Sequence, residues 1–275
     1  MTPLLAAKAQ RLRDLHAAPG LFVIANPWDA VSARLLEARG FPALATSSAA
    51  AAALLGRPDN RVTRDEALAH AAVIARAVNV PVSGDLEYGF GAEPTTVAET
   101  IRLAAEVGLA GGSIEDFTGD QRAPLFEIGF AAERVHAAVA AARGLGLPFV
   151  VTARAENLLH PGHDSIDEAI RRLQAYEAAG ADVLFAPGLR RIEDIRRVCA
   201  AVRRPVNIMA SIAGLGLSLR ELEAAGVKRV SLAASLYRAA LTATDEAARE
   251  ILEQGTFGFT GRILSGDAVK CHLRD

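Results

Sequence analysis

Three acidic residues, Asp85, Glu87 and Glu115, could together hold a divalent metal ion. Asp85 and Glu87 come directly after the apolar run 80–84, and Glu115 ends the run 111–115. If these runs are neighbouring parallel strands, the carboxylates crowd together at one edge, which is unfavourable unless a cation neutralises them. Mg²⁺ prefers oxygen ligands and takes one or two carboxylates with water and substrate. The pattern predicts a site for Mg²⁺, or for Mn²⁺; the alternative is that the acids pair with arginines and hold no metal.

Arg154 follows a third run, 148–153, and is the predicted partner of a substrate carboxylate. Its planar guanidinium can bind a carboxylate through two parallel hydrogen bonds. The alternative is an ion pair with Glu156 or Glu115.

Small polar residues follow two other runs. Thr46, Ser47 and Ser48 stand where backbone N–H groups could approach an anion, and Ser211 lies near the end of a later run. We expect these four residues to bind substrate together with Asp85 and Arg154.

The elements that must position these residues are eight short β-branched or apolar runs separated by helical patterns. The predicted strands are 21–25, 43–46, 80–84, 111–115, 148–153, 181–186, 205–208 and 229–233. Capping boxes are expected at Thr63 with Glu66, Ser165 with Glu168 and Ser218 with Glu221. Glycines that end helices are expected at Gly40, Gly108, Gly180 and Gly226.

Strands that alternate with helices pair in parallel through right-handed crossovers, and eight such units favour a closed (β/α)8 barrel. An open doubly wound sheet is the alternative. No linker divides the chain, so we expect a single domain, 1–275, in which 236–275 is a helical tail. Active sites of these barrels lie at the carboxyl ends of the strands, which is where the acids and Arg154 stand.

Composition excludes several classes of partner. The chain has 275 residues, of which 51% are hydrophobic, and a net charge of −2, so nothing draws it to nucleic acid or to an anionic membrane. Lys8, Arg11 and Arg13 interrupt the amino-terminal segment, and no long apolar run follows, which predicts a cytoplasmic protein. Cys199 and Cys271 form no disulfide framework, in keeping with a reducing compartment.

The positions of the lysines and histidines argue against two other kinds of catalysis, through a Schiff base and through histidine. A Schiff-base lysine would have to follow a strand, whereas Lys228 precedes the predicted strand 229–233 and lies at the opposite face. His160 and His163 come after the fifth strand and could reach the mouth of the barrel, but their spacing favours a role in the loop.

Four motifs, each at the end of a predicted strand or just beyond it, resemble the isocitrate lyase/phosphoenolpyruvate mutase superfamily. They are Leu55-Gly-Arg-Pro-Asp59, Gly84-Asp-Leu-Glu-Tyr-Gly-Phe-Gly91, Ser113-Ile-Glu-Asp116 and Thr152-Ala-Arg-Ala-Glu156. The resemblance runs from about Asn26 to about Ala234 and covers nearly the whole barrel.

The resemblance implies an Mg²⁺-dependent enzyme that makes or breaks a C–C or P–C bond next to a 2-oxo acid. It implies that the three acids bind the metal and that Arg154 binds the substrate carboxylate. It also implies that residues 46–48 bind the other end of the oxo acid, and that Asp59, Arg154 and Glu115 are catalytic. It also implies a homo-oligomer, a dimer or tetramer, in which the carboxyl-terminal helix can be exchanged between subunits.

Departures from the superfamily pattern narrow the prediction. Glu87 stands where many relatives carry Asp, and strand 6 ends in Pro187 instead of an acid. The segment 117–126, which we call the lid segment, lacks the cysteine and histidine of the isocitrate lyase signature and the lysine usual in phosphonopyruvate enzymes. We therefore expect a divergent lyase acting on an oxaloacetate-like or isocitrate-like (methylisocitrate-like) 2-oxo or 2-hydroxy dicarboxylate. The alternatives are an enzyme of P–C bonds and a non-catalytic protein that binds a 2-oxo acid such as 2-oxoglutarate.

Overall fold

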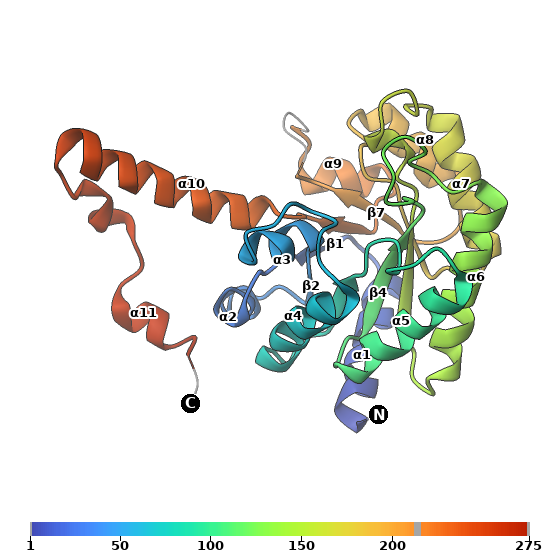
Figure 1. Ribbon diagram of the computed structural model, residues 1–275, viewed down its shortest axis with the longest axis horizontal. Helices are drawn as coiled ribbons and strands as arrows, with labels where there is room; N and C mark the ends of the chain where they lie inside the picture. The colour runs from blue at the N-terminus through green and yellow to red at the C-terminus, as the bar shows by residue number, and fades with distance from the viewer. Residues whose placement is uncertain (1, 212–215, 274–275) are drawn as a thin grey trace.

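Eight parallel strands close into a barrel in the computed structural model, which describes residues 2–211 and 216–273 (Figure 1). The strands are β1 (Phe22–Ala25), β2 (Ala43–Ala45), β3 (Val82–Asp85), β4 (Gly111–Glu115), β5 (Val150–Arg154), β6 (Val183–Phe185), β7 (Val206–Met209) and β8 (Arg229–Ser231). Each strand pairs with the next along the chain, and β8 pairs with β1. The predicted (β/α)8 barrel is confirmed, and the open sheet is excluded because the edges join.

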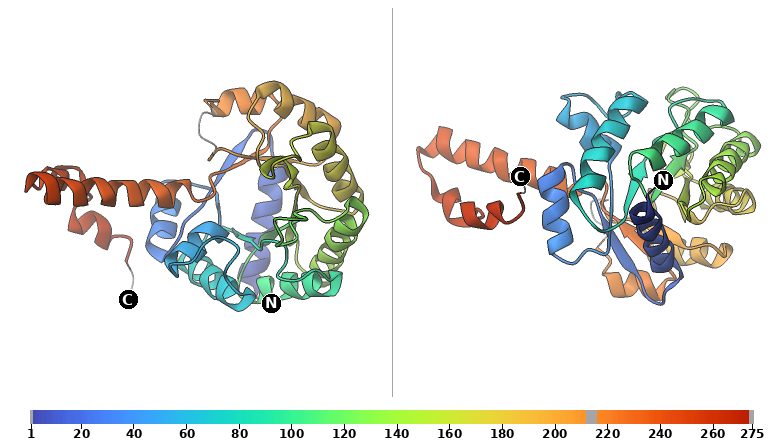
Figure 2. Two further views of the ribbon diagram at one scale, coloured as in Figure 1. Left: turned by 45° about the horizontal axis from the view of Figure 1, so that its top comes forward. Right: turned by 90° about the horizontal axis from the view of Figure 1, so that it is seen from below.

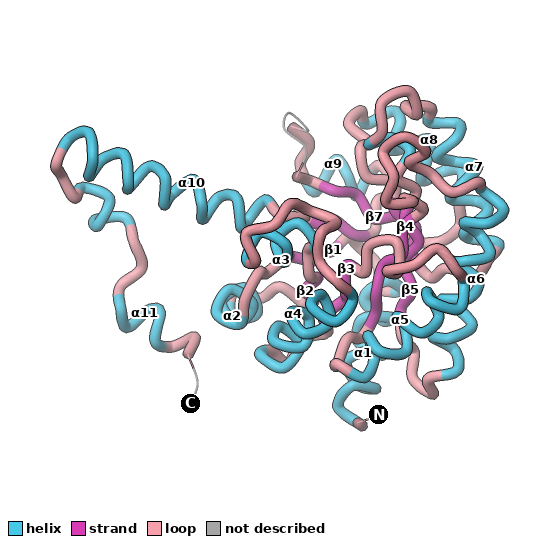
Figure 3. Tube along the Cα trace, viewed as in Figure 1, coloured by secondary structure: helices cyan, strands magenta, loops and turns pink. Residues whose placement is uncertain are grey.

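Helices α2 to α9 surround the strands on the outside of the barrel (Figures 2 and 3). They are α2 (Ala30–Ala38), α3 (Ser48–Leu54), α4 (Arg64–Ala77), α5 (Pro94–Glu106), α6 (Ile128–Gly144), α7 (Ile166–Ala178), α8 (Ile192–Ala201) and α9 (Leu219–Ala224). The remaining helices are α1 (Pro3–Ala17), α10 (Ser235–Arg249) and α11 (Gly266–Lys270). The buried apolar residues of the strands and of the surrounding helices form one hydrophobic core, to which α1 also contributes.

The predicted helix signals hold with one exception. Thr63 and Ser218 each form a capping box with the glutamate three residues on, and the four predicted glycines all have positive φ. Ser165 accepts a hydrogen bond from the amide of Glu168, but the side chain of Glu168 binds Arg172 instead of returning to the cap. The capping box predicted there is therefore only half formed, because the carboxylate has a charged partner.

Helix α1, which the sequence patterns did not reveal, lies at the amino-terminal ends of the strands. Leu12 packs against Gly111 at the start of β4, and His16 contacts Phe22 and Arg229 at the starts of β1 and β8. This helix covers the floor of the barrel, so the opposite end is the one left open for a ligand.

The carboxyl-terminal segment projects away from the barrel (Figures 1 and 2). Helix α10 continues into a π-helical turn, Glu250–Gln254, which agrees with the start of the helical tail expected over 236–275, and none of the residues of either is buried. A 3₁₀ turn, Gly258–Arg262, and α11 follow. Among the residues that the structure describes, no helix is long and apolar enough to cross a membrane.

Candidate active site

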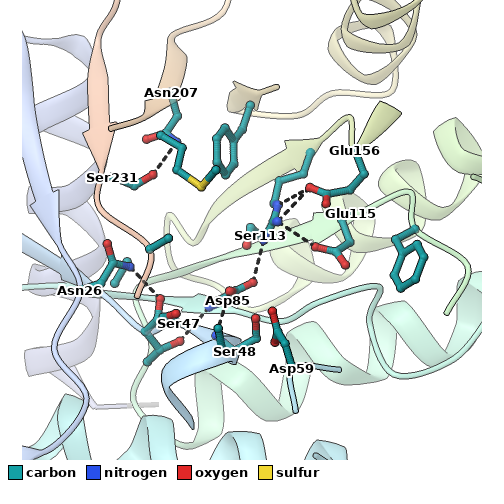
Figure 4. A pocket seen from close by; sticks show the side chains of 18 of the residues that line it. Asn26, Ser47, Ser48, Asp59, Asp85, Ser113, Glu115, Glu156, Asn207 and Ser231 are labelled. Atoms are coloured by element: carbon teal, nitrogen blue, oxygen red, sulfur yellow. Dashed lines mark hydrogen bonds and ion pairs between the residues drawn. The ribbon is translucent and has the colours of Figure 1, made fainter. Parts of the chain in front are cut away.

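A cavity of about 360 Å³ opens at the carboxyl-terminal ends of the strands (Figure 4). Seven of the predicted site residues line it: Thr46, Ser47, Ser48, Asp59, Asp85, Glu115 and Arg154. Glu87 and Ser211 do not line it, and Ser211 stands directly before residues 212–215, which lie outside the described part. The structure thus brings together residues from β2, β3, β4 and β5 that are up to 108 positions apart (154 minus 46).

Arg154 stands among acids at the centre of the site. Its guanidinium lies 2.9 Å from Asp85, 3.1 Å from Glu115 and 2.8 Å from Glu156, measured between nitrogen and oxygen. Burial alone would lower the pKa of Arg154, but the charges of these three acids raise it. The ion pairs that the sequence allowed as an alternative are therefore present. Contact between Arg154 and a substrate carboxylate stays a prediction.

The acids outnumber the base at this place. Burial raises the pKa of Glu115 well above its usual value, and the charges of Glu156 and Asp85 add to the effect against the opposing charge of Arg154. Burial, with the charges of Asp116 and Asp85, likewise raises the pKa of Glu156 against the opposing effect of Arg154. A site with more carboxylates than cations favours an added cation or proton, because each buried negative charge without a partner is costly.

Glu87 has the least satisfied carboxylate of the site. Its side chain is buried, and its Oε1 atom has no hydrogen-bond partner within the described residues. Burial, followed by the charges of Asp85 and Asp59, raises the pKa of Glu87 to about 8. Its φ of 48° lies in the left-handed region, which costs a residue other than glycine of the order of 1 kcal/mol or more. Strain and an unsatisfied buried acid at one residue are typical of functional sites, and a role of Glu87 in binding a metal stays a prediction.

The donor set fits a divalent cation, although the side chains form no ready cage. No group of three or more His, Cys, Asp or Glu side chains within residues 2–211 and 216–273 is close enough to hold an ion directly. Mg²⁺ commonly binds through one or two carboxylates and several waters, so Asp85, with Glu87 and Glu115 nearby, still suits it. The unpartnered oxygen of Glu87 is the observation in favour.

Residues 46–48 hold Asp85 in place. The amide of Asp85 donates to Oγ1 of Thr46 at 2.8 Å, and the amide of Ser48 donates to Oδ2 of Asp85 at 3.0 Å. Ser47 caps α3 by accepting a hydrogen bond from the amide of Ala50. The amide of Ser48, in the segment predicted to approach an anion, therefore binds the carboxylate of Asp85.

Asp59 reaches the cavity from the loop between α3 and α4. Figure 4 shows it beside Ser48, across from Glu115. Burial and the charge of Asp85 raise the pKa of Asp59, and a hydrogen bond with Ser48 opposes them. The acid to which the resemblance gave a catalytic role thus lines the cavity.

Arg134, on α6, supports the acids from behind and was not found from the sequence. Its fully buried guanidinium donates to the carbonyl oxygens of Tyr88, Gly91, Ala92 and Glu115. These carbonyls belong to the loop after β3 and to the end of β4, so one side chain fixes the backbone that carries Glu87 and Glu115. An arginine inside a helix has no sequence signal for this role.

A second polar layer lies deeper in the barrel. Arg229 on β8 donates to Asn207 at 2.8 Å and to Thr152 at 3.1 Å, and it lies 3.3 Å from Nε2 of His16. Burial lowers the pKa of Arg229 to about 9. These neutral partners hold a buried guanidinium between the cavity and the floor formed by α1.

His160 and Gln121 also line the cavity. The ring of His160 stacks on Phe117, the first residue of the lid segment, with centroids 5.1 Å apart and planes inclined by 17°. The lid segment is closed on itself by a bridge between Phe117 and Leu125. His160 directly follows a short 3₁₀ turn, Asn157–Leu159, and it lines the cavity from the loop after β5.

The comparisons with known proteins agree with this geometry. The family model for phosphoenolpyruvate phosphomutase matches residues 12–252. The chain belongs to the isocitrate lyase/phosphoenolpyruvate mutase superfamily. This membership confirms the resemblance drawn from the four motifs.

Three relatives illustrate the range of the superfamily. A 2-methylisocitrate lyase of Aeropyrum pernix is 31% identical over 89% of this chain and 78% of its own length. A structure from Burkholderia cenocepacia J2315, provisionally described as a lyase/mutase, is 51% identical, covers 98% of this chain and 96% of its own, and superposes with a TM-score of 0.95. An oxaloacetate acetylhydrolase in complex with its product oxalate is 26% identical over 97% of this chain and 94% of its own, with a TM-score of 0.86.

Proposed function

We propose that this protein is a divalent-metal-dependent lyase, using Mg²⁺ or Mn²⁺, that cleaves a C–C bond next to the oxo group of a small dicarboxylic acid. The substrate class is an oxaloacetate-like 2-oxo acid or an isocitrate-like (methylisocitrate-like) 2-hydroxy acid. The observation that carries the proposal is the excess of buried acids around one arginine, with the Oε1 atom of Glu87 left without a partner. Relatives named 2-methylisocitrate lyase and oxaloacetate acetylhydrolase support this class of substrate.

Each residue has a task in this proposal. Asp85, with Glu87 and Glu115, would hold the ion, which would draw electrons from the oxo and carboxylate oxygens of the acid as the bond breaks. Arg154 would bind a substrate carboxylate through its guanidinium. The guanidinium would be available because a bound cation would take over the neutralisation of Asp85 and Glu115. Asp59, whose pKa burial raises, would meet the departing fragment.

Binding and turnover can be tested separately. A panel of 2-oxo and 2-hydroxy acids is incubated with Mg²⁺, and the products are identified by NMR. Calorimetry with oxalate is run with Mg²⁺ and with EDTA; equal binding in both would overturn the metal part of the proposal. Asp59→Ala should abolish turnover and leave oxalate binding in place.

Two other functions would give different results in the same experiments. A P–C bond enzyme, which the matching family model favours, would release phosphate from phosphonopyruvate, but the lid segment lacks the expected lysine. A binding protein would retain a 2-oxo acid such as 2-oxoglutarate and turn over none of the panel.

We also propose that the tail, 236–275, joins copies of this chain as a dimer or tetramer beside the single barrel domain. Helix α10 has no buried residue, and the tail exposes Leu241, Leu252, Phe257 and Ile263. Exposed apolar side chains in one segment are typical of an interface. The cytoplasmic location stays a prediction.

A further inference from the structure

The wall of the cavity formed by the end of β4, the end of β5 and the lid segment carries an imidazole. His160 follows β5, three strands round the barrel from the Thr46–Ser48 turn after β2. An acid held at the β2 and β3 side of the mouth would therefore extend its other end toward the wall that contains His160.

The ring of His160 is held but not satisfied. It stacks on Phe117, which is 4% exposed, and its main-chain amide donates to Asn157. Its Nε2 atom is buried and has no hydrogen-bond partner among the described residues. Packing against Phe117 holds this imidazole in the cavity wall and leaves Nε2 without a hydrogen-bond partner among the described residues.

Two titratable groups, Asp116 and His163, act on the ring of His160. Asp116, at the end of β4, favours the protonated form, His163 on the same loop disfavours it, and burial, the largest effect, lowers the pKa of His160. A neutral imidazole near neutral pH can both accept and return a proton, which suits general acid–base catalysis.

No other group on this wall can do so as readily. The lid segment contributes Phe117 and Gln121 to the cavity, and neither exchanges protons. Glu115 and Glu156 are engaged by Arg154. Within the described residues, His160 is the one histidine that lines the cavity.

We propose that His160 is a catalytic residue that transfers a proton to and from carbon 3 of the bound 2-oxo acid. When the C3–C4 bond of an oxaloacetate-like acid breaks, its electron pair forms the C2–C3 double bond of an enolate, and C4 leaves as CO2. The ring of His160, once protonated by solvent, gives this proton to C3, so the enolate becomes the oxo acid and the imidazole is neutral again. This inference rests on the proposed function.

The reverse half of this step can be measured without knowing the natural substrate. Pyruvate or 2-oxobutyrate in D2O, with Mg²⁺ and the intact protein, should lose its C3 hydrogen signals in the proton NMR spectrum faster than without protein. His160→Gln should slow this protein-dependent exchange by about 100-fold or more, the usual share of a general acid–base residue. The matched control is His163→Gln, on the same loop but outside the cavity lining of the described chain, which should stay within about twofold of the wild type.

Oxalate calorimetry with Mg²⁺ separates the two levels of the argument. The inference is supported if His160→Gln loses exchange but keeps oxalate binding and the unfolding midpoint of the wild type. Three results would overturn the role of His160 and leave the proposed function standing. The first is hydrogen exchange that is unchanged in His160→Gln, and the second is a wild type that binds oxalate but shows no exchange. The third is a His160→Gln variant that loses exchange and oxalate binding together. A wild type that binds neither oxalate nor any 2-oxo acid removes the proposed function, and this inference with it.

Discussion

Nη1 of Arg154, at the end of β5, lies 2.9 Å from Oδ1 of Asp85 at the end of β3, so this ion pair reaches across the intervening strand β4. Both side chains are mostly buried, with exposures of 14% and 15%. The same guanidinium contacts Glu115 on β4. Three neighbouring strand ends, those of β3, β4 and β5, are therefore joined by one side chain.

Arg154→Lys should lower kcat/KM by about 100-fold or more, the usual effect of removing one positioned hydrogen-bond donor from an active site. Lysine keeps the charge but cannot bridge three carboxylates or bind a substrate carboxylate through two parallel bonds. Steady-state kinetics on the best acid of the panel checks this. Arg122→Lys, at a side chain 91% exposed on the lid segment, is the control and should behave as wild type. Near-normal kinetics of Arg154→Lys would show that Arg154 only balances charge.

Glu87→Gln should stabilise the metal-free protein and weaken its affinity for Mg²⁺. The amide removes a buried acid whose Oε1 atom has no partner, and we expect a gain of about 1 kcal/mol in the free energy of unfolding. Loss of a residue that supports metal binding typically costs about 10- to 100-fold in affinity. Urea unfolding in EDTA and Mg²⁺ calorimetry measure the two effects, with the exposed Glu93→Gln as control. Unchanged Mg²⁺ affinity would remove Glu87 from the metal site.

Arg134→Lys should both destabilise the protein and loosen the acids. Lysine cannot donate at once to the carbonyls of the loop after β3 and to that of Glu115, so we expect a loss of about 3 kcal/mol in the free energy of unfolding. Urea unfolding gives the loss, and Mg²⁺ calorimetry at a temperature where the variant is folded gives the effect on the site. Arg102→Lys, on the surface of α5, is the matched control. Wild-type Mg²⁺ affinity in a folded Arg134→Lys protein would confine Arg134 to stability.

His16 should make the barrel sensitive to acid. Burial, then the charge of Arg229, lowers the pKa of His16 to about 3 from a usual 6.5. The unfolded chain therefore binds the proton first as the pH falls below 6.5, so stability drops between about 6.5 and about 3, by up to about 1.4 kcal/mol per pH unit.

Urea unfolding at several pH values checks this effect. His16→Gln keeps an acceptor for Arg229 and cannot titrate, so its stability should fall less steeply with acid than that of the wild type. The exposed His136→Gln should follow the wild type. Equal slopes for His16→Gln and the wild type would contradict the argument.

Charging the tail should reduce the oligomer. Leu241 and Leu252 are 49% and 85% exposed, and aspartate at both would place charges in the proposed interface. Light scattering after gel filtration should show a dimer or tetramer for the wild type and a smaller species for the double variant. Leu4→Asp, at a side chain 61% exposed on α1, tests whether any surface charge has this effect. A monomeric wild type would remove the proposal.

Much of the fold could be predicted because its signals are local. Thr63 with Glu66 and Ser218 with Glu221 start helices, and the four predicted glycines end them, through contacts within a few residues. Strand alternation then leaves the closed barrel as the favoured arrangement, and the barrel puts Asp85, Glu115 and Arg154 at one end. Helix α1 was not predicted, because the residues that it packs against, such as Gly111, lie far along the chain.

The sequence by itself determined that Asp85, Glu115 and Arg154 lie at one end of the barrel; only the tertiary structure decided which other residues join them and what each contacts. That Arg154 pairs with three acids, that the amide of Ser48 binds Asp85, and that the Oε1 atom of Glu87 is left without a partner depend on side-chain directions across three strands. The placement of His160 against Phe117 depends on the packing of two loops. Such contacts join residues distant in the chain, and their geometry follows from the packing of the whole barrel rather than from any local pattern.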